Sequence, residues 1–278
     1  MAMKNPHRRG FALPMVIAIM VIATTILGAI LVRHSGSQST VKRHLDAYLD
    51  HHTARGMQEA VAAWLNGNAN APMRELLDFD GKAFDLIGED GGVVSVYFEE
   101  AQDTALAQFA GLSPQELQLA AGVIDALRED LGPQAARFTR KEGPMTISVL
   151  SAPREVLEAA ARSVVGGARA DDVAIELMRI REDPEPTDGK LNEAFANLSV
   201  TPEDRAKLLQ IVTAEPALWR VTIVSSTGAG EPVRYRALTM VPGGRRRSGA
   251  AGAAAGGVRR SSSFLSWEKV FDEPDQAR

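Results

Sequence analysis

The sequence contains one pair of carboxylates, Asp125 and Glu129, that we consider for acid–base chemistry because of their spacing. Asp125 and Glu129 stand one helical turn apart; such a pair can act as general acid and base, and it is also the ordinary pattern of a solvated helix face. All five histidines lie within the first 52 residues, and the chain has no cysteine. The rest of the chain therefore has no Ser-His or Cys-His pair. We expect a protein that is not an enzyme, with a carboxylate hydrolase using Asp125 as the alternative.

The same distribution limits metal binding. Beyond residue 52 there is no imidazole or thiolate ligand, so a metal in that part of the chain would be calcium or magnesium held by oxygen. Asp78-Phe79-Asp80-Gly81 begins like an EF-hand loop, but Lys82 stands where the third ligand belongs and Gly81 comes two positions early. We expect a turn there and predict no cofactor and no metal ligand. Calcium binding stays open, with no residue assigned to it.

The net charge of −4 conceals an uneven distribution along the 278 residues. Residues 1–65 carry seven basic and three acidic residues, and residues 242–278 carry seven and four. Residues 66–241 hold the remaining 17 basic and 28 acidic residues, a net charge of −11. A segment with this much negative charge is unsuited to binding nucleic acid through phosphate contacts, so we expect no nucleic-acid partner.

An apolar segment near the N-terminus has the length of a membrane span. Phe11–Val32 contains 22 residues without a charged side chain and directly follows Arg8-Arg9-Gly10. As a helix it would be roughly 33 Å long, against a bilayer core of about 30 Å. A secretory signal has a shorter apolar region, with its cleavage site after that region. We therefore predict a membrane anchor whose leader ends at Gly10, with an uncleaved, kinked signal anchor as the alternative.

The residues at this junction, Arg9-Gly10-Phe11-Ala12-Leu13, resemble the processing site of type IV prepilins and type II secretion pseudopilins. The resemblance implies that prepilin peptidase removes residues 1–10 after Gly10 and that Phe11 is then N-methylated. Pro14 becomes the fourth residue of the mature chain. A proline costs a helix little there, because the first four N–H groups have no intrahelical partner.

The start of the mature helix is the predicted membrane and assembly surface, formed by Leu13, Pro14, Met15, Val16 and Ile17. Most pilins carry glutamate at the position of Met15, and its carboxylate is thought to pair with the terminal amine of a neighbouring subunit. An unpaired carboxylate in a bilayer costs several kcal/mol, so an apolar residue suits a subunit with no neighbour beyond it. Met15 therefore fits a position at the filament tip, and it equally fits a loss of the glutamate's function.

Positively charged residues do not decide the orientation, because three precede the span and three follow it closely. The resemblance favours a cytoplasmic N-terminus, since the leader peptidase of this class acts on that side and long domains translocate largely regardless of charge. We expect a single-pass inner-membrane protein with a periplasmic head, which joins a pseudopilus after assembly.

A helical pattern continues beyond the span. Apolar residues recur mostly at three- and four-residue steps up to Leu65, and Asn66-Gly67-Asn68 then ends the run. The members of this pattern are Val41, Leu45, Tyr48, Leu49, Met57, Val61, Trp64 and Leu65. We predict one spine helix over residues 11–65, with two helices joined at Gly36 as the alternative.

The remaining sequence alternates strand and helix signals. Helix starts are indicated at Ser113-Pro114-Gln115-Glu116 and Thr201-Pro202-Glu203-Asp204, where a capping residue precedes a proline. The other expected elements are a strand at 93–98, helices at 153–165 and 171–181 joined by Gly166-Gly167, and a hairpin of 219–226 and 233–241. We predict that residues 242–278 form a flexible tail, because they are rich in Gly, Ala, Arg and Ser. The apolar cluster within that tail (Phe264, Leu265, Trp267, Val270, Phe271) is either a docking motif or a terminal turn that folds back on the head.

This order of elements resembles the K-type minor pseudopilin of type II secretion. The segment that carries the resemblance is Ile147–Leu157, where the family shows Ile-Asn-Val-Asn-Thr-Ala, two residues and Val-Leu. Further matches are Val123–Asp130, Val173–Arg181, Phe195 and Val224-Ser225-Ser226. Ser148 and Leu150 replace both asparagines and Ala126 replaces a tryptophan, so the calcium sites of the family do not transfer residue by residue.

The resemblance implies an α+β fold, in which a long pilin-type helix precedes a small antiparallel sheet that a helical, SAM-like insert interrupts. The expected divisions are leader 1–10, spine 11–65, first part of the head 66–100, insert 101–218, hairpin 219–241 and tail 242–278. The implied function is that of a tip or initiation subunit in the export of folded proteins. Its partners would be other minor pseudopilins, the inner-membrane assembly platform, prepilin peptidase and the membrane. A minor tip pilin of a type IV pilus is the alternative.

Overall fold

The structure is a computed structural model that describes residues 12–68, 71–88, 91–198, 200–226, 232–241 and 263–270. Within its helices, the side chains of residues 12–19, 22, 29, 31–39 and 168 lie outside the description. The chain divides into two compact units, one up to Ala60 and the other from Val61 onward. The first unit is formed by most of helix α1, and the second is the head.

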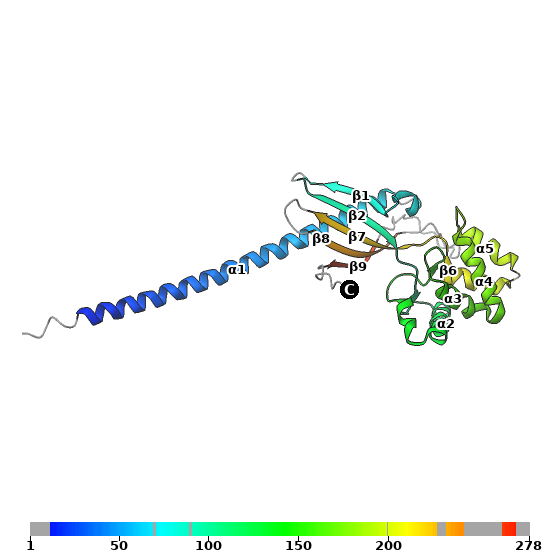
Figure 1. The fold of residues 1–278 in the computed structure, drawn as a ribbon, viewed down its shortest axis with the longest axis horizontal. Coiled ribbons are helices and arrows are strands. Elements are labelled where there is room, and N and C mark those ends of the chain that lie inside the picture. Colours follow the sequence, from blue (N-terminus) through cyan, green and yellow to red (C-terminus); the bar gives the residue numbers. More distant parts are fainter. Residues whose placement is uncertain are drawn as a thin grey trace, which may run out of the picture. The chain divides into compact units, whose positions relative to one another are not determined.

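Helix α1 runs from Ala12 to Gly67 and contains 56 residues (Figure 1). It has no break at Gly36, and it ends at the Gly67-Asn68 signal, where Asn68 donates from its side-chain amide to the Trp64 carbonyl at 2.8 Å. The long N-terminal helix of the predicted fold class is thus confirmed. Among the residues that could be searched, no helix is long and apolar enough to cross a membrane. The predicted span, Phe11–Val32, lies partly outside the described residues.

The head contains an antiparallel sheet of five strands in the order β1-β2-β7-β8-β9 (Figure 1). The strands are β1 Lys82–Ile87, β2 Val93–Glu100, β7 Leu218–Ser226, β8 Val233–Met240 and β9 Ser263–Val270. The expected strand at 93–98 and the expected hairpin correspond to β2 and to β7 with β8. The mixed α+β class with an antiparallel sheet is therefore confirmed, and β1 is a strand that the sequence analysis did not anticipate.

Alternation along the strands gives the sheet one apolar face, because successive side chains point to opposite sides. Val96, Phe98, Val221 and Ile223 are buried on this face. The last turns of α1, which belong to the head, supply its cover. Trp64 packs against the rings of Phe84 and Phe98, with centroid separations of 5.5 and 5.3 Å.

The insert lies between β2 and β7, in agreement with the predicted fold class. Its helices are α2 Pro114–Leu131, α3 Arg154–Val165, α4 Gly167–Arg181, α5 Asp188–Asn197 and α6 Pro202–Ile211. The short elements are η1 Met73–Leu76 before the sheet, and β3 Ala105–Leu106, η2 Gly132–Phe138, β4 Thr139–Arg140, β5 Ile147–Ser148 and β6 Val212–Thr213 within the insert. Phe195, Leu127, Leu157 and Leu177 are fully buried in its core.

Local sequence signals account for most helix boundaries in the insert. Ser113 and Glu116 form the expected capping box, and the Thr201 side chain caps α6. Gly166 and Gly167 have φ of 60° and 56°, which lets the chain turn sharply between α3 and α4. Helix α5, capped by Thr187, was not anticipated.

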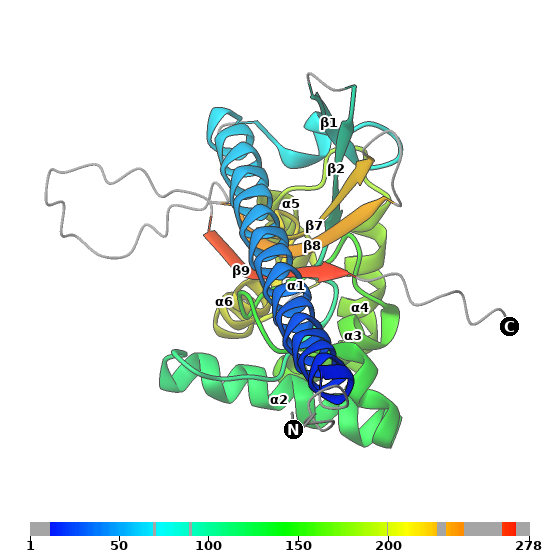
Figure 2. The same ribbon diagram turned by 90° about the vertical axis from the view of Figure 1, so that its left-hand side faces the viewer.

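The prediction that residues 242–278 form a flexible tail is wrong for Ser263–Val270. These residues form β9, which pairs with β8 along its length (Figure 2). A bulge at Leu238/Thr239 brings Phe264 and Trp267 together, with ring centroids 5.4 Å apart. Phe264, Leu265, Trp267 and Val270 of the apolar cluster therefore fold back on the head as part of a strand, and Phe271 lies outside the described residues. Composition does not reveal this strand, because its pairing partner lies upstream in the chain. The rest of the predicted tail beyond Val241 lies outside the described residues.

We expect Phe195→Ala to lower the free energy of unfolding by about 3–5 kcal/mol, because it empties a fully buried site in the insert. Urea unfolding of the detergent-solubilised full chain measures the change. Phe79→Ala is the matched control, since Phe79 is fully exposed and its loss should leave stability nearly unchanged. Equal effects of the two substitutions would contradict the described core.

Candidate functional site

The predicted processing residues, Gly10 and Phe11, lie outside the described residues. The predicted assembly residues from Leu13 to Ile17 lie in the first turns of α1, although their side chains are not described. Pro14 thus occupies the part of the helix where backbone N–H groups have no intrahelical acceptor. Cleavage, methylation and the assembly role of this segment remain predictions.

The described part of α1 carries a stripe of unpartnered apolar side chains. Val41, Leu45, Tyr48 and Leu49 are between 54% and 66% exposed, and their spacing puts them on one face of the helix. The Tyr48 ring also contacts the His52 ring, with centroids 4.2 Å apart. A face of this kind gains from packing against another helix, because water is then removed from it.

Nearer the N-terminus, α1 exposes apolar side chains on several faces, as Met20, Val21, Ile26, Leu27 and Ile30 show. The two hydroxyl groups in this stretch are satisfied within the helix itself: Thr24 and Thr25 donate to the carbonyls of Met20 and Val21. A helix that is apolar all round is suited to a fully buried or lipid environment.

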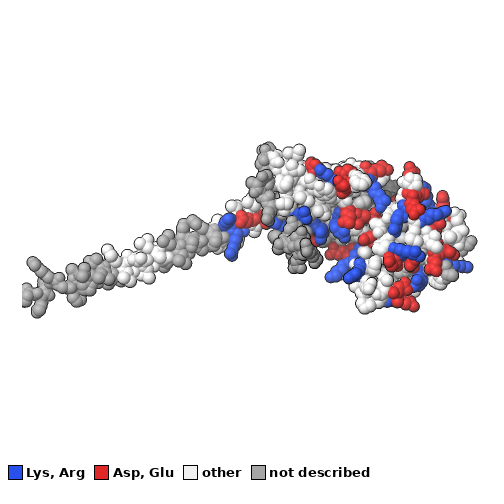
Figure 3. Space-filling model, viewed as in Figure 1, with Lys and Arg blue, Asp and Glu red and all other residues white. Residues whose placement is uncertain are grey.

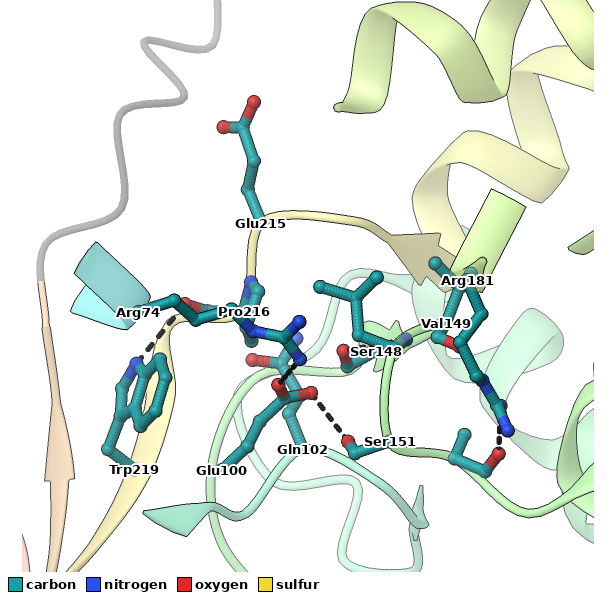
Figure 4. Close-up of polar contacts among 12 residues, drawn as sticks. Arg74, Glu100, Gln102, Ser148, Val149, Ser151, Arg181, Glu215, Pro216 and Trp219 are labelled. Carbon is teal, nitrogen blue, oxygen red and sulfur yellow. Dashed lines mark hydrogen bonds and ion pairs between the residues drawn. The ribbon is translucent and has the colours of Figure 1, made fainter. Parts of the chain in front are cut away.

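In the head, the sheet and the insert meet at the buried side chain of Gln102 (Figure 4). Its carbonyl oxygen accepts from the backbone N–H groups of Ala217 and Leu218 at 2.8 and 3.1 Å. Its amide nitrogen donates to Thr146 Oγ1 at 2.6 Å. The Gln102 backbone carbonyl accepts from Ser148 N at 2.7 Å. One residue thus joins the chain entering the insert to the chain leaving it.

A buried carboxylate reinforces this junction. The Glu100 side chain is 7% exposed, and its Oε2 lies 2.8 Å from Arg74 Nη2. Its other oxygen accepts from Ser151 Oγ at 2.5 Å (Figure 4). Glu100 therefore connects η1, the end of β2 and the loop before α3, and both of its oxygens have partners, as a desolvated carboxylate requires.

The segment that carries the K-type resemblance forms the other side of the same junction. Arg181, at the end of α4, donates from Nε to the Val149 carbonyl at 2.9 Å and from Nη2 to the Ala152 carbonyl. Ser148 is fully buried, and its Oγ accepts from Leu150 N at 3.2 Å. The described role of these residues is to fix the insert to the sheet.

Arg140 lies close by in β4 and donates from Nη2 to the carbonyls of Pro144 and Thr146. Burial lowers the pKa of its guanidinium to about 10, while the nearby Asp103 carboxylate opposes the shift. The group therefore stays charged at neutral pH.

The carboxylates considered for catalysis lie on a solvated helix surface. Asp125 and Glu129 are both exposed on α2, and Asp125 forms a loose ion pair with Arg128 at 3.7 Å. Within the described part of the chain, no group of three metal-ligating side chains lies together. Figure 3 shows acidic and basic side chains interspersed over the visible face of the head.

A shallow groove of about 540 Å³ separates α4 from α5. Two of its carboxylates are already paired, Glu176 with Arg179 at 2.6 Å and Asp183 with Lys190 at 2.6 Å. The hydrogen bond from Lys190, followed by the N–H of Glu185, lowers the pKa of Asp183 below its ordinary value. The pair of Asp183, just after α4, with Lys190 in α5 thus links the two helices.

No family model and no curated protein matches this sequence. Among solved structures, this chain is similar to one chain in the crystal structure of the GspK–GspI–GspJ complex from the type 2 secretion system of enterotoxigenic Escherichia coli. The match has 10% identity and a TM-score of 0.42, and it covers 79% of this chain and 99% of that chain. The similarity is one of fold, and at this level it does not assign a function.

We expect Gln102→Met to reduce the free energy of unfolding by about 3 kcal/mol. The substitution removes the hydrogen-bond partner of the Ala217 and Leu218 N–H groups and of the Thr146 hydroxyl. Thermal or urea unfolding of the full chain measures this loss. Gln118→Met, on the exposed surface of α2, is the control and should change little. A similar result for both variants would show that the Gln102 contacts do not hold the junction.

We expect Lys190→Met to raise the pKa of Asp183 toward the ordinary value of about 3.9. The stabilising effect of the pair is present above the ordinary pKa and disappears as the pH falls through the lowered one. NMR titration of the Asp183 carboxyl measures the shift. Lys207→Met, which removes the ion pair with Glu203, should leave Asp183 unchanged, and an unaltered pKa in Lys190→Met would refute the pairing.

Proposed function

We propose that this protein is a minor pseudopilin, a non-enzymatic tip or initiation subunit of a type II secretion pseudopilus that supports export of folded proteins across the outer membrane. The observation that carries the proposal is the architecture. A 56-residue helix is followed, after η1, by an antiparallel sheet, and a helical insert lies in the chain between the neighbouring strands β2 and β7. The Arg-Gly-Phe junction at the start of the apolar segment supports the same assignment.

In the proposed mechanism, the apolar segment stores the protein in the inner membrane until an assembly platform extracts it. Helix-to-helix contacts within the pseudopilus then replace its contacts with lipid. The exposed stripe from Val41 to Leu49 would extend these helix contacts beyond the membrane, because its apolar side chains are more than half exposed among the described residues. Other minor pseudopilins are the proposed neighbours.

The proposed topology is a single span with the N-terminus in the cytoplasm and the head in the periplasm. Prepilin peptidase would remove residues 1–10, and Phe11 would become the methylated N-terminus. Met15, in place of the usual glutamate, supports a terminal position in the filament, since such a subunit has no further amine to pair with. The proposed divisions of the chain follow the sequence, with β9 added to the head.

We expect the intact mass of the membrane-extracted protein to correspond to a chain that starts at Phe11 and carries one added methyl group. Gly10→Val should block processing and retain the ten-residue leader, because the peptidase cuts after this glycine. Gly28→Ala is the matched control and should be processed normally, since a methyl group at Gly28 meets no atom within 4 Å. Retention of Met1–Gly10 by the native chain, in cells with an active prepilin peptidase, would contradict the proposal.

A deletion strain distinguishes the proposed role in secretion from the alternative role in a type IV pilus. Loss of this protein should abolish export of folded periplasmic proteins and leave pilus extension and retraction intact. The opposite pattern would assign the chain to a pilus.

A further inference from the structure

Strand β1 forms one edge of the five-stranded sheet and, among the described residues, pairs with β2 alone. Three large apolar side chains are exposed along this edge. Ile87 is 77% exposed at the end of β1, and Leu86 beside it is also exposed. Phe79 is fully exposed in the turn that precedes the strand. Exposed apolar edge strands invite pairing with another chain, and folded proteins usually protect them.

The protection on this edge covers only part of β1. A register irregularity separates Lys82 from Phe84, and Lys82 forms an ion pair with Asp85 at 2.7 Å. A bulge and paired charges are devices that blunt the start of an edge. From Phe84 to Ile87 the pairing with β2 is regular, so the backbone there has the geometry to accept a further strand.

The described residues at and before this edge are acidic. Residues 75–88 contain four acidic residues and one basic residue, a net charge of −3. The basic residue, Lys82, is already paired, whereas Asp78 and Asp80 flank the exposed Phe79. Asp78 Oδ1 accepts from the N–H groups of Asp80 and Lys82, which fixes the turn that presents Phe79.

We propose that the β1 edge binds an extended segment of a neighbouring subunit, which adds to the sheet as a sixth strand and carries apolar residues flanked by Lys or Arg. The proposal rests on the proposed function, which supplies other minor pseudopilins as neighbours. Backbone hydrogen bonds to β1 give the contact its register, and Phe79 and Ile87 are covered at its two ends. The β1 edge of a second copy of this chain is a poor occupant, because it would bring a second net charge of −3 to the same edge.

The absence of cysteine allows a clean crosslinking experiment. Full-length Ile87→Cys, labelled with a benzophenone maleimide, is illuminated in membranes that contain the other minor pseudopilins of the same secretion system. Ile175→Cys is the matched control, since Ile175 is 57% exposed on α4 of the insert. We expect position 87 to crosslink to another minor pseudopilin within an extended, Lys- or Arg-containing stretch, and position 175 to give no such product.

Substitutions test the chemistry of the contact. Phe79→Ala with Ile87→Ser should weaken co-purification of the neighbouring subunit by about tenfold. Asp80→Lys should weaken it as well, whereas Asp125→Lys, a charge reversal on the exposed surface of α2, should not. Unchanged urea unfolding of these variants shows that the head stays folded, and higher salt should lower the crosslink yield.

Three results would overturn the docking proposal while leaving the proposed function in place, provided that the subunits co-purify. These are equal crosslinking from positions 87 and 175, a product with a second copy of this chain, and co-purification that persists in the Phe79→Ala, Ile87→Ser variant. Failure of this chain to co-purify with any minor pseudopilin would instead count against the proposed function itself.

Discussion

The organisation of the head depends on one constraint, which is that β2 and β7 are neighbours in the sheet although the whole insert separates them in the chain. Glu100 pairs with Trp219, so the chain must leave the sheet and return to it at adjacent positions. Gln102 meets this requirement, because its buried carboxamide holds the N–H groups of Ala217 and Leu218 and reaches Thr146. A buried carboxamide without partners would be costly there, and the contacts of both its oxygen and its nitrogen join the sheet to the insert.

The same constraint gives a physical meaning to the segment that resembles the K-type pseudopilins. Its residues pack around the junction, where Arg181 holds the carbonyl of Val149 and Ser151 donates to Glu100. Ser148, at the position of a family asparagine, is itself fully buried, and its hydroxyl is satisfied because it accepts from Leu150 N. In this chain the described contacts of these residues join the insert to the sheet.

Outside this junction, the described residues include two exposed apolar surfaces, and they differ in kind. The stripe from Val41 to Leu49 is a helix face, which suits side-by-side packing of helices. The β1 edge presents a strand with exposed Leu86 and Ile87, which suits an extended partner. If the proposed function holds, both surfaces would be available for contacts that form on assembly.

The elements that could be predicted from the amino-acid sequence are those with local signals: the long helix, the caps at Ser113 and Thr201, the Gly166-Gly167 turn and the β7–β8 hairpin. The sequence also supplied the Gly10–Phe11 processing hypothesis, which depends on adjacent residues and not on folding. The roles of Gln102, Glu100 and Arg181 could not be predicted from the sequence, because their hydrogen-bond partners lie far away along the chain. Only the tertiary structure decided that Ser263–Val270 is a strand, because strand pairing is a long-range interaction that local composition does not encode.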